Sequence, residues 1–258
     1  MSEQIERLLH FYETEKALVT SPFIQQTGFL DRRLLQGVFG RLGIGGDFEI
    51  VVDIGCGSGL LSTFFTDAAL YVGVDIVSHP TFSRYRDERH RFIRADAQYP
   101  SLASGSADIL MCLDSFEHYP QPQLAAHEFF RVLKPDGVLF LSAPNYANVA
   151  GLVKKYMERY GGYGQNTWAP FDFWKPEELE HFITPKRVKR LFRSAGFSKF
   201  EMMGYDREVA VGLFPWVWHP KMPGKLERAI RLLFYPVSKP IVYFCPTSSL
   251  HTFWKITK

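Results

Sequence analysis

The chain has 258 residues, of which 46% are hydrophobic, which is enough for one sizeable core and is ordinary for a globular protein. A formal net charge of +3 gives by itself no argument for a nucleic-acid ligand. Its three cysteines are widely spaced and show neither a metal-binding spacing nor a disulfide framework, so a reducing cytoplasm is expected.

The predicted elements begin with helical patterns over residues 5–12 and 27–42, with no apolar signal-peptide core. Apolar, strand-like runs follow at 48–54, 69–75, 91–95, 107–113 and 137–143, with helical stretches between several of them, notably 122–133. A helix over 185–195 and two further strands, at 198–205 and 250–256, complete the pattern. Apolar strands separated by helices predict a parallel, doubly wound sheet that binds ligands at the carboxyl ends of its strands.

Four segments organise the expected architecture. Residues 1–45 are predicted to form an N-terminal helical lid, and 46–258 the main domain. Within that domain, 145–183 is an aromatic-rich insert expected to cap a substrate, and 209–246 is a basic, apolar segment. From Val209 onward the charge is +6, whereas the preceding residues carry −3, which favours an anionic or membranous partner for the tail.

The most informative motif is VVDIGCGSG, Val51 to Gly59, a strand that runs through alternating glycines and is expected to lead into a helix. A dinucleotide fingerprint needs a third small residue for close helix packing, and Leu60 stands at that position. A phosphate-binding loop needs a Gly-Lys-Ser/Thr sequence, which is missing here. Asp53 would also repel a pyrophosphate. A ligand that carries an amine and a sulfonium suits the turn better.

With these residues the chain resembles the class I S-adenosylmethionine-dependent methyltransferases. The motifs that carry the resemblance, in order, are VVDIGCGSG, VGVDI, RADA, CLDSFEHYP and RVLKPDGVLFLSAPN, and they extend over roughly residues 48–200. The resemblance implies a Rossmann-like, seven-stranded α/β sheet whose last strand is antiparallel. It also implies S-adenosylmethionine as methyl donor and S-adenosylhomocysteine as product.

The resemblance further implies roles for individual residues. Asp53 would contact the amino end of the donor, Asp75 the two ribose hydroxyls, and Asp96 and Ala97 the adenine. The expected cofactor-binding residues are Asp53, Gly55, Cys56, Gly57, Gly59, Asp75, Ile76, Asp96, Ala97 and Leu113. Cys56 is expected to line the turn as a small residue and not to act as a nucleophile.

The loop after the fourth strand contains the candidate catalytic residue, His118, which could remove a proton from a hydroxyl acceptor. A histidine that only buttresses the loop is an equally weighted interpretation. Asp114, Glu117 and His118 are also similar to the Glu-x-x-Glu-His pattern of ubiquinone-pathway O-methyltransferases, in which such side chains can hold a divalent metal. Asp114 is one methylene shorter than that pattern, so no resident metal is expected here.

The tail sequence KLERAIRLLFY places Leu226, Ile230, Leu233 and Phe234 on one helix face, flanked by basic residues. Such a helix either lies on a membrane surface or packs on its own domain. The expected activity is O-methylation of a small or lipid-linked metabolite, in the cytoplasm or at the inner face of the membrane, and no nucleic-acid partner is expected. N- or C-methylation and the oligomeric state stay open, and the rival hypothesis is a non-catalytic protein of the same fold that binds the cofactor or a membrane.

Overall fold

A computed structural model describes residues 3–14, 21–24, 29–160, 180–218 and 222–258. The chain divides into two compact units. Unit 1 comprises Met1–Ser142, Lys189–Glu201 and Trp254–Lys258, and unit 2 comprises Ala143–Val188 and Met202–Phe253. Much of the expected substrate-capping insert, residues 161–179, lies outside the described residues, so its role stays a prediction.

A seven-stranded sheet in the order β3-β2-β1-β4-β5-β7-β6 forms the framework. Its strands are β1 (Ile50–Ile54), β2 (Leu70–Asp75), β3 (His90–Arg94), β4 (Ala107–Leu113), β5 (Leu133–Pro144), β6 (Lys199–Gly204) and β7 (His251–Thr257). The first five strands pair in parallel. β7 runs the other way, because Leu250 bonds to Asn145 after the end of β5 whereas Lys258 bonds to Gly137 near its start. The Rossmann-like fold with an antiparallel last strand is therefore confirmed.

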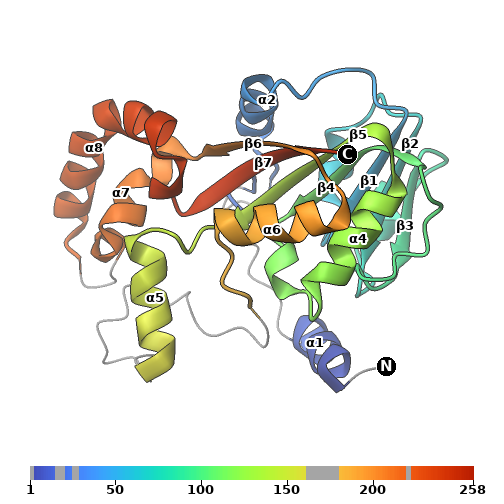
Figure 1. Cartoon of the computed structure of the whole chain (residues 1–258), viewed down its shortest axis with the longest axis horizontal. Coiled ribbons are helices and arrows are strands. Elements are labelled where there is room, and N and C mark those ends of the chain that lie inside the picture. The colour runs from blue at the N-terminus through green and yellow to red at the C-terminus, as the bar shows by residue number, and fades with distance from the viewer. Residues whose placement is uncertain (1–2, 15–20, 25–28, 161–179, 219–221) are drawn as a thin grey trace. The chain divides into compact units, whose positions relative to one another are not determined.

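Helices cover both faces of the sheet in unit 1 (Figure 1). On one face, α2 (Arg32–Arg41) buries Leu35, Val38 and Phe39, and the Phe39 ring lies 5.0 Å from that of Phe140 on β5. On the other face, α4 (Pro122–Val132) and α6 (Pro185–Ala195) bring Phe129 and Phe192 together, with ring centroids 6.4 Å apart. The remaining unit 1 helices are α1 (Glu3–Thr14), α3 (Phe82–Tyr85), η1 (Leu60–Thr63) and η2 (Phe116–His118).

Unit 2 is mainly helical. Its elements are α5 (Val149–Tyr160), η3 (Asp206–Glu208), α7 (Val209–Leu213), η4 (Pro215–Trp218), α8 (Gly224–Phe244) and η5 (Pro246–Ser248). α7 is in contact with α5 and α8, and it buries Val209, Ala210 and Val211. Over the described residues, none of the helices has both the length and the apolar character that crossing a bilayer requires.

The helix expected directly after the glycine turn is instead a single 3-10 turn, η1. Two hydroxyl groups compete with helical hydrogen bonding there. Ser62 Oγ donates to Gly59 O at 2.7 Å, and Thr63 Oγ1 donates to Leu60 O at 2.8 Å. Side chains that bond to nearby carbonyls in this way favour short turns over continued α-helix.

Candidate cofactor and methyl-transfer site

The glycine turn between β1 and η1 depends on backbone conformations that side chains rarely adopt. Gly55, Gly57 and Gly59 have φ angles of +73°, +51° and +76°. A Cβ on Gly55 would lie 2.0 Å from Ser115 Oγ, and one on Gly59 would lie 2.6 Å from the Phe92 ring. A Cβ on Gly57 would meet nothing within 4 Å. The chain therefore closes against the first and third glycines and leaves open space above the second, as a turn that accepts a ligand requires.

Asp75, at the carboxyl end of β2, is tied to this turn. Its Oδ2 accepts a hydrogen bond from Gly57 N at 2.8 Å, and its Oδ1 accepts one from Val77 N at 3.1 Å. Burial raises the pKa of this carboxyl group, and the backbone donors of Val77 and Gly57 act in the opposite direction. A carboxylate beside the open part of a glycine turn can accept hydrogen bonds from a pair of sugar hydroxyls.

Asp53 lies deeper than Asp75. It is buried within β1, and Tyr71 donates its hydroxyl proton to Asp53 Oδ2 at 2.5 Å. Burial raises the pKa of Asp53 to about 7, partly offset by the Tyr71 hydrogen bond and reinforced by the charge of Asp75. Tyr71 was not among the predicted site residues. The sheet register could have indicated it, because Asp53 pairs with Gly73 and Tyr71 is two residues away on the same face.

Asp96 anchors the loop after β3 through a residue that the motifs did not indicate. Gln98 Nε2 lies 3.1 Å and 3.0 Å from the two Asp96 carboxylate oxygens, and Gln98 Oε1 accepts a bond from Gln121 N at 2.7 Å. This chain of bonds links the β3 loop to the start of α4. Its only sequence signal is a glutamine two residues after an acid, and the structure alone shows that this glutamine is buried.

The loop after β4 packs directly against the glycine turn. Ser115 Oγ lies 2.8 Å from Tyr119 Oη, and Tyr119 Oη lies 3.4 Å from Cys112 Sγ. Asp114, between the strand and this network, adopts a φ of +46°. Backbone in this region is costly for a non-glycine residue and is concentrated at functional sites.

His118 ends η2 within the same loop. Its ring lies 6.4 Å from that of Tyr12 on α1, in an edge-to-face arrangement, and its Nε2 lies 3.8 Å from Glu117 Oε1. The side chain is 15% exposed, so the ring is mostly buried and keeps some access to solvent. α1 also reaches the end of β3, where Glu13 pairs with Arg94 at 3.2 Å. α1 thus contacts the end of β3 and the loop that follows β4.

Within the described part of the chain, no group of three or more His, Cys, Asp or Glu side chains is arranged to hold a metal ion. This finding covers Asp114, Glu117 and His118, which all lie in the described part of the chain. Cys56 is buried at the turn, and burial raises the pKa of its thiol well above the ordinary range. A thiol of that kind is a poor nucleophile at neutral pH.

The space above Gly57 lies beside the Asp75 carboxylate, an arrangement that fits a donor with sugar hydroxyls. Residues 52–141 match the family model described as Methyltransferase domain. The match identifies residues 52–141 as a methyltransferase domain, and with the fold it indicates an S-adenosylmethionine-dependent methyltransferase of the class I type. S-adenosylmethionine is its methyl donor, as the resemblance of the motifs implies.

Two sequence relatives illustrate what the methyltransferase is similar to. A ubiquinone biosynthesis O-methyltransferase of Neisseria meningitidis serogroup A is 24% identical over 174 residues, which cover 62% of this chain and 68% of that enzyme. An uncharacterized methyltransferase of Mycolicibacterium gilvum is 34% identical over 118 residues, which cover 44% of this chain and 46% of the relative.

Solved structures share the fold at low sequence identity. A possible histamine N-methyltransferase of Thermotoga maritima aligns over 100% of both chains with a TM-score of 0.56 and 15% identity. A Haemonchus contortus N-methyltransferase, bound to phosphomonomethylethanolamine and S-adenosylhomocysteine, aligns over 87% of this chain and 52% of that one, with a TM-score of 0.55 and 14% identity.

The remaining predicted cofactor residues of the methyltransferase end the same strands. Ile76 follows β2, and its carbonyl accepts a bond from Arg94 Nε at 3.1 Å. Ala97 is buried after β3, and Leu113 is the last residue of β4. The carboxyl ends of β1, β2, β3 and β4 therefore bring the predicted set together in unit 1, while contact of each residue with the donor stays a prediction.

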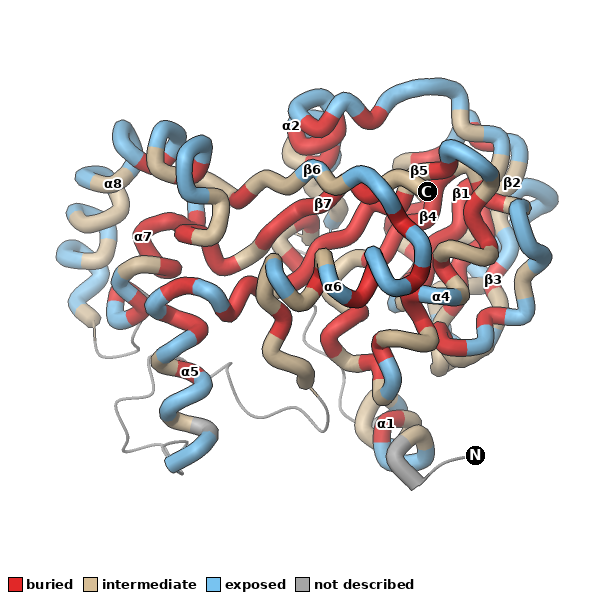
Figure 2. Tube along the Cα trace, viewed as in Figure 1, coloured by how far each residue is buried: buried red, intermediate tan, exposed pale blue. Residues whose placement is uncertain are grey.

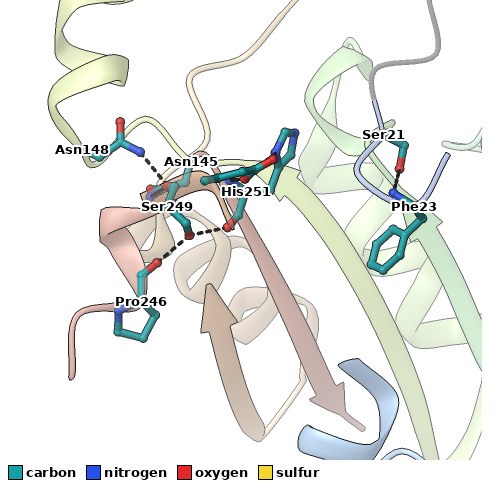
Figure 3. A network of polar contacts seen from close by, with 8 residues as sticks. Ser21, Phe23, Asn145, Asn148, Pro246, Ser249 and His251 are labelled. Atoms are coloured by element: carbon teal, nitrogen blue, oxygen red, sulfur yellow. Dashed lines mark hydrogen bonds and ion pairs between the residues drawn. The ribbon is translucent and has the colours of Figure 1, made fainter. Parts of the chain in front are cut away.

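Unit 2 of the methyltransferase has its own polar cluster after β5 (Figure 3). Asn145 Nδ2 donates to Ser249 O at 2.9 Å, Asn148 Nδ2 donates to the same carbonyl at 2.6 Å, and Ser249 Oγ donates to His251 O at 2.7 Å. The His251 ring in turn lies 2.9 Å, through Nδ1, from Glu208 Oε1. These bonds hold the start of β7 beside the residues that follow β5.

Proposed function

We propose that this methyltransferase O-methylates a small or lipid-linked metabolite by direct in-line transfer. The observation that carries the proposal is the placement of His118, which is partly exposed in a loop that packs on the glycine turn and is covered by α1. The relative named as a ubiquinone biosynthesis O-methyltransferase supports the choice of an oxygen acceptor.

The sulfonium of the donor supplies an electrophilic methyl group, so the protein has to align the acceptor and remove its proton. His118 is the proposed base that takes the hydroxyl proton. α1 is the proposed lid, because its ring and ion-pair contacts cover the loops after β3 and β4. Exclusion of water by such a lid would protect the aligned acceptor.

The proposed cofactor contacts are those of Asp75 with the ribose hydroxyls, of Asp96 and Ala97 with the adenine, and of Asp53 with the amino end. Gly55, Cys56, Gly57, Gly59, Ile76 and Leu113 complete the proposed set. The proposal places the enzyme in the cytoplasm, at the inner face of the membrane when its acceptor is lipid-linked.

Calorimetric titration with S-adenosylmethionine and S-adenosylhomocysteine tests the cofactor site. Asp75→Ala is expected to weaken both ligands by about tenfold or more, which corresponds to roughly 1.4 kcal/mol. Asp67→Ala, at an exposed acid away from the turn, is the matched control and should bind as the wild type does. If the wild type binds neither ligand, the assignment of the site is wrong.

Transfer of a labelled methyl group to aqueous and membrane extracts tests the reaction. His118→Asn is expected to lower kcat by about 100-fold, the usual scale for losing a general base, with unchanged affinity for S-adenosylmethionine. His127→Asn, at an exposed histidine of α4, is the control. Full activity in His118→Asn would exclude the base, a product methylated on nitrogen or carbon would exclude O-methylation, and cofactor binding without transfer would favour the non-catalytic alternative.

A further inference from the structure

Most residues along α8 in unit 2 are exposed or half-buried (Figure 2), and many of the exposed ones are large and apolar. Leu233 is 74% exposed and Phe244 is 84% exposed, and the set extends along the whole helix. Its members are Leu226, Leu232, Leu233, Tyr235, Val237, Tyr243 and Phe244. Large contiguous apolar surface on a soluble protein marks a site of interaction with another protein or a membrane.

The helix has two distinct sides. Ser238 and Val242 are buried on the inner side, where α8 contacts α7, η3 and η5. Leu226, Leu233, Val237 and Phe244 recur at intervals of seven, four and seven residues, so they form one stripe along the outer side. The helix therefore packs on its own unit through one side and exposes an apolar stripe on the other. The sequence-based grouping was partly wrong, since Ile230 and Phe234 are half-buried.

Exposed cations flank the stripe. Lys225, Arg228 and Lys239 are exposed along α8, and the only acid of the helix, Glu227, pairs with Arg231 at 2.9 Å. The helix therefore carries a net charge of +3. Lysine is depleted in the cores of protein–protein interfaces, whereas basic residues beside an apolar helix face suit anionic lipid headgroups.

Aromatic side chains and prolines set how such a helix would meet a bilayer. Tyr235 and Tyr243 are exposed, and Trp216 lies nearby on η4, which contacts α8. Tyrosine and tryptophan favour the headgroup region. Pro236 and Pro240 lack the N–H groups that would bond to carbonyls one turn earlier. Carbonyls left without donors are tolerated near water and not in hydrocarbon, so the helix suits the interface plane.

We propose that the outer face of α8 docks the protein on the surface of a bilayer that contains anionic lipid, with the helix parallel to the membrane plane. The apolar stripe enters the acyl boundary, and Lys225, Arg228 and Lys239 meet the headgroups. The inference rests on the surface of unit 2 and is independent of the methyl acceptor.

Flotation of the full chain with lipid vesicles tests the docking. The wild type should float with vesicles of phosphatidylcholine mixed with phosphatidylglycerol, and less with phosphatidylcholine alone or at high salt. The double variant Leu233→Ser/Phe244→Ser should lower the partition coefficient about tenfold or more on mixed vesicles. Arg228→Glu should weaken binding to mixed vesicles only.

Matched controls distinguish membrane binding through this face from nonspecific hydrophobic or electrostatic binding. Phe29→Ser removes an aromatic of unit 1 that is 69% exposed, and Arg190→Glu reverses an exposed cation of the basic helix α6, so both should bind as the wild type does. S-adenosylmethionine affinity should be unchanged in every variant, which reports on folding.

Three outcomes would overturn the proposal. Failure of the wild type to float with mixed vesicles would refute docking on a membrane, and α8 variants that float like the wild type would exclude this surface. A dimer in sedimentation velocity that Leu233→Ser/Phe244→Ser converts to monomer would show that a second copy covers the face instead. None of these results would bear on cofactor binding, which is measured separately.

Discussion

The three glycines of the turn meet different steric demands. Gly55 faces Ser115 and Gly59 faces Phe92, so the packing of unit 1 alone accounts for the absence of side chains there. Gly57 has no such neighbour, although its φ of +51° still disfavours other residues. Among the described residues no atom fills the space above Gly57, and the proposed donor would occupy it.

Substitution of Gly57 by alanine separates backbone strain from ligand binding. Gly57→Ala is expected to cost about 1 to 2 kcal/mol of folding stability, from the left-handed φ, and to weaken S-adenosylmethionine binding at least tenfold. Gly105→Ala is the matched control, because Gly105 has a φ of +61° and open space around its missing Cβ but lies outside the turn. Equal affinities in the two variants would refute a ligand above Gly57. Denaturant melts and calorimetry provide both measurements.

Because its pKa is raised on folding, Asp53 should lower the stability of the protein as pH rises, whereas a salt-bridged acid does the reverse. Its ordinary pKa is 3.8, and burial raises the folded-state pKa to about 7. Below both values the folded and unfolded states are equally protonated. Between them the unfolded state loses its proton first, so the free energy of unfolding falls as pH rises, by up to about 4 kcal/mol, and levels off above pH 7.

Urea denaturation of the wild type and Asp53→Asn across pH 4 to about 8 measures this contribution. Asparagine keeps an oxygen that can accept the Tyr71 hydrogen bond, and it does not titrate. The wild type should therefore lose stability relative to Asp53→Asn as pH increases. Curves that stay parallel would mean that folding does not raise the pKa of Asp53.

At the scale of elements, the strands were the most predictable part of the fold. The five apolar runs and the two further expected strands all form strands. The central strands were predictable because strands buried on both faces need continuous hydrophobic sequence, whereas β3 and β6 are partly exposed. The stretch after the glycine turn and the length of α8 were not predictable in this way. Hydroxyl bonds of Ser62 and Thr63 limit η1, while α8 continues through Pro236 and Pro240 to Phe244.

The candidate site was predictable where a motif marks a strand end, and not where two distant segments meet. Gly55, Asp75 and Asp96 lie at or just after the ends of consecutive strands and so come to one edge of the sheet. The contacts of Tyr71 with Asp53 and of Ser115 with Tyr119 depend on register and loop packing, for which local sequence has no pattern.

The proposed lid, α1, can be tested through its two contacts. Tyr12→Ala with Glu13→Gln removes the ring contact to His118 and the ion pair with Arg94. We expect S-adenosylmethionine to dissociate about tenfold faster, as loss of roughly 1.4 kcal/mol of closure would produce. Glu6→Gln, at an exposed position of the same helix, should dissociate as the wild type does. Unchanged dissociation in the double variant, by stopped-flow fluorescence, would exclude a lid.

For the whole molecule, the chain passes from one unit to the other several times. β6 contributes Lys199–Glu201 to unit 1 and continues into unit 2, and β7 leaves unit 2 after Phe253 and ends in unit 1. Neither unit is a continuous segment that could unfold without disturbing strands of the other. We therefore expect a single cooperative unfolding transition.

Lys154 of α5 offers a local perturbation within unit 2 that tests this cooperativity. Its side chain is only 4% exposed, forms an ion pair with Glu180 and donates to Tyr146 Oη at 2.9 Å. Lys154→Met removes the cation beside a carboxylate that is 15% exposed and leaves it the Tyr146 hydrogen bond, and breaking a buried pair costs about 3 to 5 kcal/mol. Lys154→Met/Glu180→Gln removes both charges and should recover part of the loss. Lys155→Met, at the exposed neighbouring position, is the control.

Differential scanning calorimetry distinguishes the two possible responses. At roughly 2 to 4 °C per kcal/mol for a chain of this size, Lys154→Met should lower the midpoint of one undivided transition by several degrees. If the units unfold independently, the variant will instead split the heat-capacity peak and leave one part at the wild-type temperature. Because S-adenosylmethionine is expected to bind unit 1, saturating ligand should then raise the midpoint of the whole transition only when the units are coupled.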